Sequence, residues 1–376
     1  MKLRLKIFSL FLLSFIVING QSTTDASLLK KAKLEIYDNP EKAIRIGKQL
    51  LKKDNSLKTS IEIYMLLSTA NVAKRNFEES LKYILKAKEL SQKTNDAKSQ
   101  VSVLVSVAIQ YQQMELFSKS LETLNEADQY LAKIPEKTPE KYIETATIYA
   151  IKGMIYKSQS NPDIALEKFL ISIENFEKVP AKKTTYSNMS VVYYNIGYCY
   201  LNLNQIDKAQ QAFLQSTDCA QRNNAKSLEA FALKGMSEVY KQKHENQTAI
   251  NLLIKAENLS KNTGDIILNE GIYNEMANNY LAMGQQDQYQ LYNKKYFEMK
   301  FKRKQNELSS INQVIDNHNK ETSVKSQKLK SQYYYMNILS FVIASILIPI
   351  LLYFIVRITK QNKNFQKEIQ QIIHTP

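Results

Sequence analysis

The chain has few of the residues that interrupt or cross-link a backbone: 8 glycines, 7 prolines, 2 cysteines and no tryptophan among 376 residues. A multi-stranded sheet needs glycine-rich turns, so this scarcity argues against a β architecture. Leu, Ile, Lys, Gln, Asn and Glu dominate instead, which favours an all-α fold. Two cysteines cannot build a disulfide framework. We expect Cys199 and Cys219 to be buried thiols, roughly 13 Å apart on antiparallel helices.

The residues that usually carry chemistry are also scarce. The three histidines are His244, His318 and His374, and no two of them have the spacing of metal ligands. The chain contains no phosphate-binding glycine loop and no G-x-S-x-G motif. Its carboxylates are scattered at helical spacing, as on solvated faces. We therefore expect no catalytic residue, no metal and no cofactor, and a protein that is not an enzyme.

The net charge of +15 is unevenly distributed. Residues 1–20 contribute +3, residues 294–332 contribute +6 and residues 357–376 contribute +3, which leaves only +3 for residues 21–293. A body that binds nucleic acid would need a basic stripe on one face. We therefore expect no direct contact with nucleic acid.

Residues 1–20 have the layout of a secretory signal peptide. A basic head is followed by an apolar run from Ile7 to Ile18 and then by Gly20, after which we place the cleavage site. Ile18 is large for the position three residues before the cut, so an uncleaved membrane anchor is the alternative. No cysteine follows the cut that could carry a lipid anchor.

Residues 333–356 form a second hydrophobic segment, with no charged residue between Lys330 and Arg357. The core Met336–Val356 would be about 31 Å long as a helix, close to the thickness of a bilayer's hydrocarbon layer. A run of tyrosines at one edge is typical of a membrane interface. A buried helix of a soluble protein is the alternative. The prediction is a single-pass membrane protein, with residues up to 332 periplasmic and a short cytoplasmic tail at 357–376.

A five-position pattern recurs along the rest of the chain. It consists of a small residue, a residue three later that is usually aromatic, a second small residue nine beyond, a large residue four later and a small residue three after that. One unit is Gly197, Tyr200, Ala209, Phe213 and Ser216. The six units begin at Ser68, Ala108, Gly153, Gly197, Ser237 and Ala277, and a degenerate unit covers about 26–52. We interpret each unit as two antiparallel helices that cross at the small residues and stack on the next pair.

This pattern resembles the tetratricopeptide repeat over residues 26–299. The resemblance implies a helical-hairpin solenoid of about six to seven units. The spacings of 40, 45, 44, 40 and 40 residues exceed the family's usual period, which implies longer helices or longer links. The family's tryptophan near the start of each unit is absent. Its place is taken by Tyr64, Leu104, Tyr149, Tyr193, Leu233 and Tyr273.

In arrays of this family the first helix of each unit lines a concave groove, which implies a protein or peptide ligand. The residues expected to point there are Tyr194, Asn195, Tyr198, Lys234, Glu238, Asn274 and Asn278. Asparagine can pair with both polar groups of a peptide bond, and tyrosine adds rigid contact area. The alternative for each residue is an ordinary exposed helix position.

Residues 300–332 are expected to form a helical stalk between the array and the membrane. Phe301, Leu308, Ile315, Thr322 and Leu329 recur every seven residues, which weakly favours a homodimer through a coiled coil. Lys304, His318 and Lys325 interrupt this seam, so a single amphipathic helix is the alternative.

The whole arrangement resembles the sensor half of flavobacterial membrane regulators, which carry such an array outside and a helix-turn-helix transcription domain or a histidine kinase inside. Nothing after Val356 matches either output domain. One hypothesis is therefore a binding module that signals across the membrane, through a missing domain or a partner. The other is a scaffold for envelope protein complexes that passes no signal.

Overall fold

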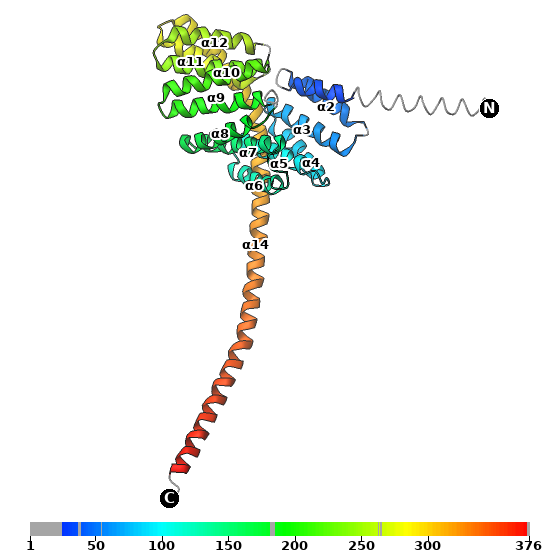
Figure 1. Cartoon of the computed structure of the whole chain (residues 1–376), viewed down its shortest axis with the longest axis vertical. Coiled ribbons are helices and arrows are strands. Elements are labelled where there is room, and N and C mark those ends of the chain that lie inside the picture. The colour runs from blue at the N-terminus through cyan, green and yellow to red at the C-terminus, as the bar shows by residue number, and fades with distance from the viewer. Residues whose placement is uncertain are drawn as a thin grey trace, which may run out of the picture. The chain divides into compact units, whose positions relative to one another are not determined.

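The computed structural model describes residues 25–36, 39–53, 55–180, 185–261, 263 and 265–373, with side chains except at 309–318, 321, 325 and 368–373. These residues are helical wherever they form regular structure, and no strand occurs among them (Figure 1). The expected all-α fold is confirmed. The predicted signal peptide lies outside the described residues. The chain divides into two compact units, Met1–Asn312 and Gln313–Pro376.

The first unit is a series of helical hairpins. A helix over residues 25–34 pairs with α2 (Pro40–Leu51) to form the first. The first helices of the next six hairpins are α3 (Leu57–Ala73), α5 (Ala97–Gln113), α7 (Pro139–Ser158), α9 (Tyr186–Asn202), α11 (Lys226–Gln242) and α13 (Ile266–Ala282). Their partners are α4 (Phe77–Ser91), α6 (Phe117–Leu131), α8 (Pro162–Glu177), α10 (Ile206–Arg222), α12 (Asn246–Ser260) and α14 (Gln286–Ile373).

The small residues of the sequence pattern lie where the paired helices touch. In the α3–α4 hairpin, the hydroxyls of Ser68 and Ser80 are 3.0 Å apart and both residues are fully buried. In the α7–α8 hairpin, a Cβ added to Gly153 would lie 2.6 Å from the ring of Phe169. A larger side chain would therefore force the helices apart. The prediction that helices cross at these positions is confirmed.

The six turns that follow α3, α5, α7, α9, α11 and α13, which we call the inner helices, have the same backbone form. In each of them the second residue after the inner helix has a positive φ, at Arg75, Glu115, Ser160, Asn204, His244 and Gly284. The next amide then reaches back to the helix, as in the bonds from the Gln205 N–H to the Tyr200 carbonyl (2.8 Å) and from the Glu245 N–H to the Tyr240 carbonyl (2.9 Å). This left-handed cap satisfies carbonyls that the helix end leaves free.

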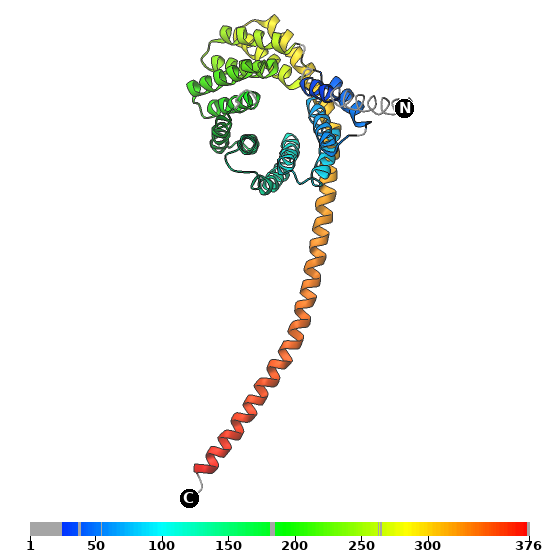
Figure 2. The same ribbon diagram turned by 45° about the vertical axis from the view of Figure 1, so that its right-hand side comes forward.

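The hairpins follow one another around an arc, and the beginning of α14 returns beside α3 and α4 (Figure 2). The guanidinium of Arg75, in the α3–α4 turn, donates to the Glu307 carboxylate at 2.6 Å. Asn306 donates to the Lys74 carbonyl at 3.4 Å. The first unit therefore closes on itself through residues that are 232 positions apart in sequence.

The second unit is the remainder of α14, which is exposed wherever its side chains are described. Thr322–Lys367 is long enough and apolar enough to cross a membrane, judged by length and composition. Pro349 lies inside this stretch without ending the helix. The helix also runs without interruption through the predicted borders of array, stalk, span and tail, and these borders stay predictions.

Candidate ligand-binding groove

The inner helices present one repeated face. Tyr194 on α9, Lys234 on α11 and Asn274 on α13 occupy equivalent positions, each 40 residues from the next. Tyr198, Glu238 and Asn278 are equivalent in the same way, one turn further along. Residues one turn apart share a helix face. The local repeat therefore explains why the six residues lie in two rows.

Tyr198, Lys234 and Glu238 form one polar cluster between α9 and α11. The Lys234 ammonium donates to the Tyr198 hydroxyl at 2.6 Å and to the Glu238 carboxylate at 2.8 Å. The Tyr198 hydroxyl donates to the same carboxylate. Burial raises the pKa of Tyr198 well above its usual value. Burial also opposes the charge on Lys234, but nearby Tyr194 and Glu238 outweigh this and raise its pKa. The cluster is thus a neutral phenol beside an ion pair.

Aromatic rings surround this cluster. The ring of Tyr194 contacts those of Tyr198, Phe213 and Phe231, with centroids 4.9, 6.0 and 5.6 Å away. Edge contacts of this kind stabilise aromatic groups beyond the area that they bury. The two tyrosines are therefore held in place by the rings around them.

Asn195 leads to a residue that the sequence analysis missed. Asn195 is 8% exposed, and its amide donates to the Val191 carbonyl at 2.8 Å. Its side-chain oxygen accepts a hydrogen bond from Lys157 of α7 at 2.7 Å. The Lys157 ammonium also lies 4.9 Å from the centroid of the Tyr198 ring, within the range of a cation–π contact. Burial lowers the pKa of Lys157 to about 8.

The repeat pattern contains a signal that could have found Lys157. Lys157 follows Gly153 by four residues, as Lys241 follows Ser237 in α11. Each lysine bonds to a side chain of the next inner helix, Lys157 to Asn195 and Lys241 to Glu275. In both cases the bonded residue lies two positions before the first small residue of that helix's repeat unit. A lysine at this position of a unit therefore points toward the neighbouring inner helix.

We call the cavity beside Asn195 the inner pocket, with a volume of about 500 Å³. Almost all of its walls come from the inner helices α5, α7, α9 and α11, with Phe176 of α8 added. Its lining consists of Ile109, Gln112, Gln113, Thr147, Ala150, Ile151, Met154, Lys157, Ser158, Phe176, Asn188, Ser190, Val191, Val192, Tyr194, Asn195, Leu228 and Phe231. The walls are mostly apolar, with amides and hydroxyls between the apolar groups.

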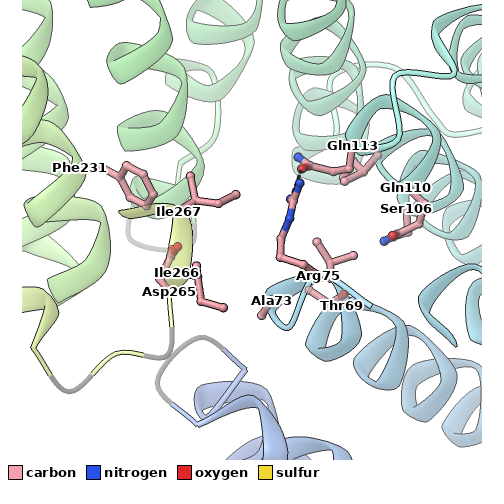
Figure 3. Close-up of a pocket in the computed structure, with 12 residues that line it drawn as sticks. Thr69, Ala73, Arg75, Ser106, Gln110, Gln113, Phe231, Asp265, Ile266 and Ile267 are labelled. Carbon is pink, nitrogen blue, oxygen red and sulfur yellow. Dashed lines mark hydrogen bonds between the residues drawn. The ribbon is translucent and has the colours of Figure 1, made fainter. Parts of the chain in front are cut away.

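A second cavity, of about 280 Å³, lies where the first unit closes on itself (Figure 3). We call it the seam pocket; it is lined by Thr69, Val72, Ala73, Arg75, Ser106, Ile109, Gln110, Gln113, Phe231, Asp265, Ile266 and Ile267. Arg75 points into it from the α3–α4 turn and donates to Gln113 at 3.2 Å, and Asp265 faces it from the N-cap of α13. Ile109, Gln113 and Phe231 line both cavities, so the two adjoin along one groove.

The structure brings some of the expected groove residues together and leaves two apart. Tyr194 and Asn195 line the inner pocket, and Tyr198, Lys234 and Glu238 form the adjacent cluster. Asn274 lines a separate shallow cavity with Tyr296 and Arg303, and Asn278 is exposed. Neither asparagine of α13 lines the inner pocket or the seam pocket.

The groove shows no metal-binding arrangement. Within the described part of the chain, no group of three or more His, Cys, Asp or Glu side chains is placed to hold a metal ion. Cys199 and Cys219 are free and buried, as expected, and burial raises the pKa of each thiol to about 11. The cysteines are therefore packing residues of α9 and α10.

Fold and groove together define an all-α solenoid built from tetratricopeptide-type hairpins. The tetratricopeptide-repeat family model matches residues 61–94 and 191–222, which are most of α3–α4 and most of α9–α10. No curated protein sequence matches the chain.

Solved structures share the architecture at low sequence identity. NprR in complex with its cognate peptide NprX is 13% identical over 72% of this chain and 77% of that one, with a TM-score of 0.54. A Rap protein complexed with the competence and sporulation factor is 12% identical over 76% of this chain and 99% of the Rap chain, with a TM-score of 0.49. A signal-transduction ATPase with a tetratricopeptide-repeat sensor, from Pyrococcus horikoshii, is 14% identical over 79% of this chain and 49% of the ATPase chain, with a TM-score of 0.48.

Proposed function

We propose that this chain is a membrane-anchored module that binds a peptide or an extended protein segment along the inner pocket and the seam pocket. The observation that carries the proposal is the inner pocket. Its volume of about 500 Å³ falls within the range of small-ligand sites, and its apolar walls alternate with amides that can pair with a backbone. A non-enzymatic binding role is consistent with this lining.

A relative of the same fold supports a peptide as the ligand. NprR was solved with a bound peptide, and it shares the solenoid architecture with this chain. An extended peptide offers one polar pair and one side chain per residue, which suits a groove that alternates amides and apolar side chains. The preformed Tyr194–Tyr198 wall would reduce the ordering that binding requires.

The proposed location and output rest on the apolar stretch of α14 and on the predicted signal peptide. Thr322–Lys367 would anchor the protein, with the array in the periplasm if residues 1–20 act as a signal peptide. Ligand capture would then be passed to the cytoplasmic side through α14, to an output domain or a partner. Residues 300–332 would offer a second copy a helical surface for a homodimer.

Ligand binding is testable on the full chain in detergent micelles. The probe is a fluorescent pool of heptapeptides, with binding followed by anisotropy. We expect the wild type to bind and Asn195→Ala to bind about tenfold more weakly, because the pocket wall loses the buried amide that holds Lys157 in place. Asn278→Ala is the matched control and should bind as the wild type does. Equal binding by all three proteins would place the ligand elsewhere.

A scaffold that passes no signal is the second candidate. Leu170, Leu214 and Ile254 occupy one register on α8, α10 and α12, and they are 48%, 53% and 40% exposed. Such an outer apolar row suits contact with another protein. Deleting residues 358–376 separates the candidates. If the chain is a transducer, this deletion should cause the same transcript changes in the host as loss of the whole chain. If it is a scaffold, the deletion should cause no transcript changes.

A further inference from the structure

The inner pocket contains one charged group. Of the described residues that line it, Lys157 alone carries a charge, and the others are apolar, amide, hydroxyl or phenol side chains. An ammonium group at a mostly apolar wall is unfavourable unless an anion compensates it. Lys157 makes a hydrogen bond to Asn195 and lies near the Tyr198 ring, and neither partner supplies a negative charge.

Glu238, a carboxylate that interacts electrostatically with Lys157, already has partners. Glu238 accepts hydrogen bonds from Lys234 and from the Tyr198 hydroxyl. Lys157 and Lys234 lie 4.9 and 5.1 Å from the centroid of the same Tyr198 ring. Two ammonium groups thus surround one phenol ring beside a single carboxylate. The cluster has a surplus of one positive charge, and this surplus lies at the pocket.

The repeat supplies an internal comparison. At the equivalent step from α11 to α13, Lys241 meets the Glu275 carboxylate at 2.5 Å, and Glu275 is 8% exposed. At the step from α7 to α9, Lys157 meets the amide of Asn195, which is also 8% exposed. The same repeat position therefore forms an ion pair between α11 and α13, and it leaves the lysine without a counter-ion between α7 and α9. The step without a counter-ion is the one that opens into the pocket.

We propose that the ligand of the inner pocket is a peptide with a carboxylate that pairs with Lys157 and apolar side chains that fill the remaining walls. The inference deepens the proposed function and rests on it. One ammonium matches one carboxylate in charge. A phosphate dianion would need more donors, and the Asn195 amide already donates to the Val191 carbonyl. Gln112 and Asn188 supply amides for the peptide backbone, whereas the Gln113 amide already accepts from Arg75 and donates to Gln112.

The test uses heptapeptide pools that differ at the central position only. The central residue is Glu, Gln or Lys, the other six are drawn from Ala, Leu, Phe and Ser, and both termini are blocked. A fourth pool has central Gln and a free C-terminal carboxylate, which separates a terminal carboxylate from a side-chain one. Each pool is applied to the full chain in detergent micelles, and the retained peptides are quantified by mass spectrometry.

We expect the wild type to retain a carboxylate pool, either central Glu or free C-terminus, about tenfold better than the blocked Gln and Lys pools, because a charge-assisted bond is gained. Lys157→Met keeps the length of the side chain and removes its charge, so the preference should disappear. Asn195→Glu supplies the counter-ion that Glu275 provides to Lys241, and it should remove the preference as well. Lys241→Met is the control and should keep the preference.

The outcomes separate the two proposals. Retention of all four pools to an equal extent, or a preference for the Lys pool, overturns the carboxylate assignment and leaves peptide binding intact. A carboxylate preference that survives in Lys157→Met and Asn195→Glu also overturns it. Retention of no pool by the wild type overturns the proposed function itself.

Discussion

Phe213 shows how a single residue sets the separation of three helices. Its fully buried ring, on α10, touches the backbones of two inner helices at once. A Cβ added to Gly197 of α9 would lie 2.6 Å from the ring, and one added to Gly235 of α11 would lie 2.2 Å from it. Glycine inside a helix costs about 1 kcal/mol relative to alanine, and here close packing explains its presence.

We expect Gly197→Ala to destabilise the protein by about 1–3 kcal/mol, because overpacking exceeds the gain in helix propensity. The control is Gly271→Ala, whose new Cβ would meet the flexible stem of Lys234 at 3.1 Å. That variant should be neutral or up to about 1 kcal/mol more stable. Thermal unfolding followed by circular dichroism measures both. A Gly197→Ala variant as stable as the wild type would contradict the packing explanation.

Glu144 of α7 gives the structure a dependence on pH. It is 8% exposed, and burial raises its pKa from 4.5 to about 7, opposed by Lys98. Because the folded state binds the proton more tightly, this group's contribution to stability is complete below pH 4.5 and is lost as the pH rises through about 7.

Replacing Glu144 with glutamine should therefore increase the stability of the fold only at the higher pH. At pH 8 we expect Glu144→Gln to be about 1–2 kcal/mol more stable than the wild type, because it avoids a buried charge. At pH 4 the two proteins should differ little. The measurement is thermal unfolding at both pH values. A gain that is equal at pH 4 and pH 8 would show that ionisation of Glu144 is not its cause.

At the scale of the helical elements, the hairpins could be predicted from the sequence and their turns could not. The interval between small residues marks where two helices touch, and α3–α4 through α11–α12 follow it, whereas α13–α14 has Tyr289 where the second small residue belongs. In the six described turns that follow α3 to α13, the left-handed residue is glycine only at Gly284. At Arg75, Glu115 and His244 the closed hairpin imposes a left-handed conformation that these residue types disfavour. The local sequence therefore does not predict these turns.

The groove could be predicted in part for a similar reason. Tyr194, Asn195 and Tyr198 could be placed on the inner face from the sequence, because first helices line that face in arrays of this kind. Lys157 was missed because its role depends on the residue that faces it from the next helix, 38 positions later. Asn274 and Asn278 have the same register as the tyrosines, yet the inner pocket ends before α13. Register identifies a helix face, whereas a pocket depends on how neighbouring faces converge.

At the scale of the first unit, the contact between its two ends changes how the repeats depend on one another. In an open solenoid each repeat contacts only its neighbours, so distant repeats open independently. Here Arg75 and Glu307 join the second hairpin to the last, with side chains 13% and 12% exposed. The contact could not be predicted from the sequence, because it depends on small rotations accumulated over every intervening repeat.

The charges at this closure form a chain. Arg303 donates to Glu270 at 2.6 and 3.0 Å and to Glu307 at 2.8 Å, and Glu307 accepts from Arg75 at 2.6 Å. Hydrogen bonds to Glu270 raise the pKa of Arg303, which stays charged. Glu307 is therefore the anion shared by two guanidinium groups. Removing its charge would leave both of them with unfavourable repulsion in a largely buried site.

We expect Glu307→Gln to loosen both sides of the closure together. Amides of the α3–α4 turn and of the start of α13 should exchange with deuterium about tenfold faster, which corresponds to about 1.4 kcal/mol of local stability. Amides of α8 and α10 should not change. The control is Glu89→Gln, which breaks the exposed Lys93–Glu89 pair and should alter neither region. Faster exchange on one side alone would mean that the two ends are not coupled.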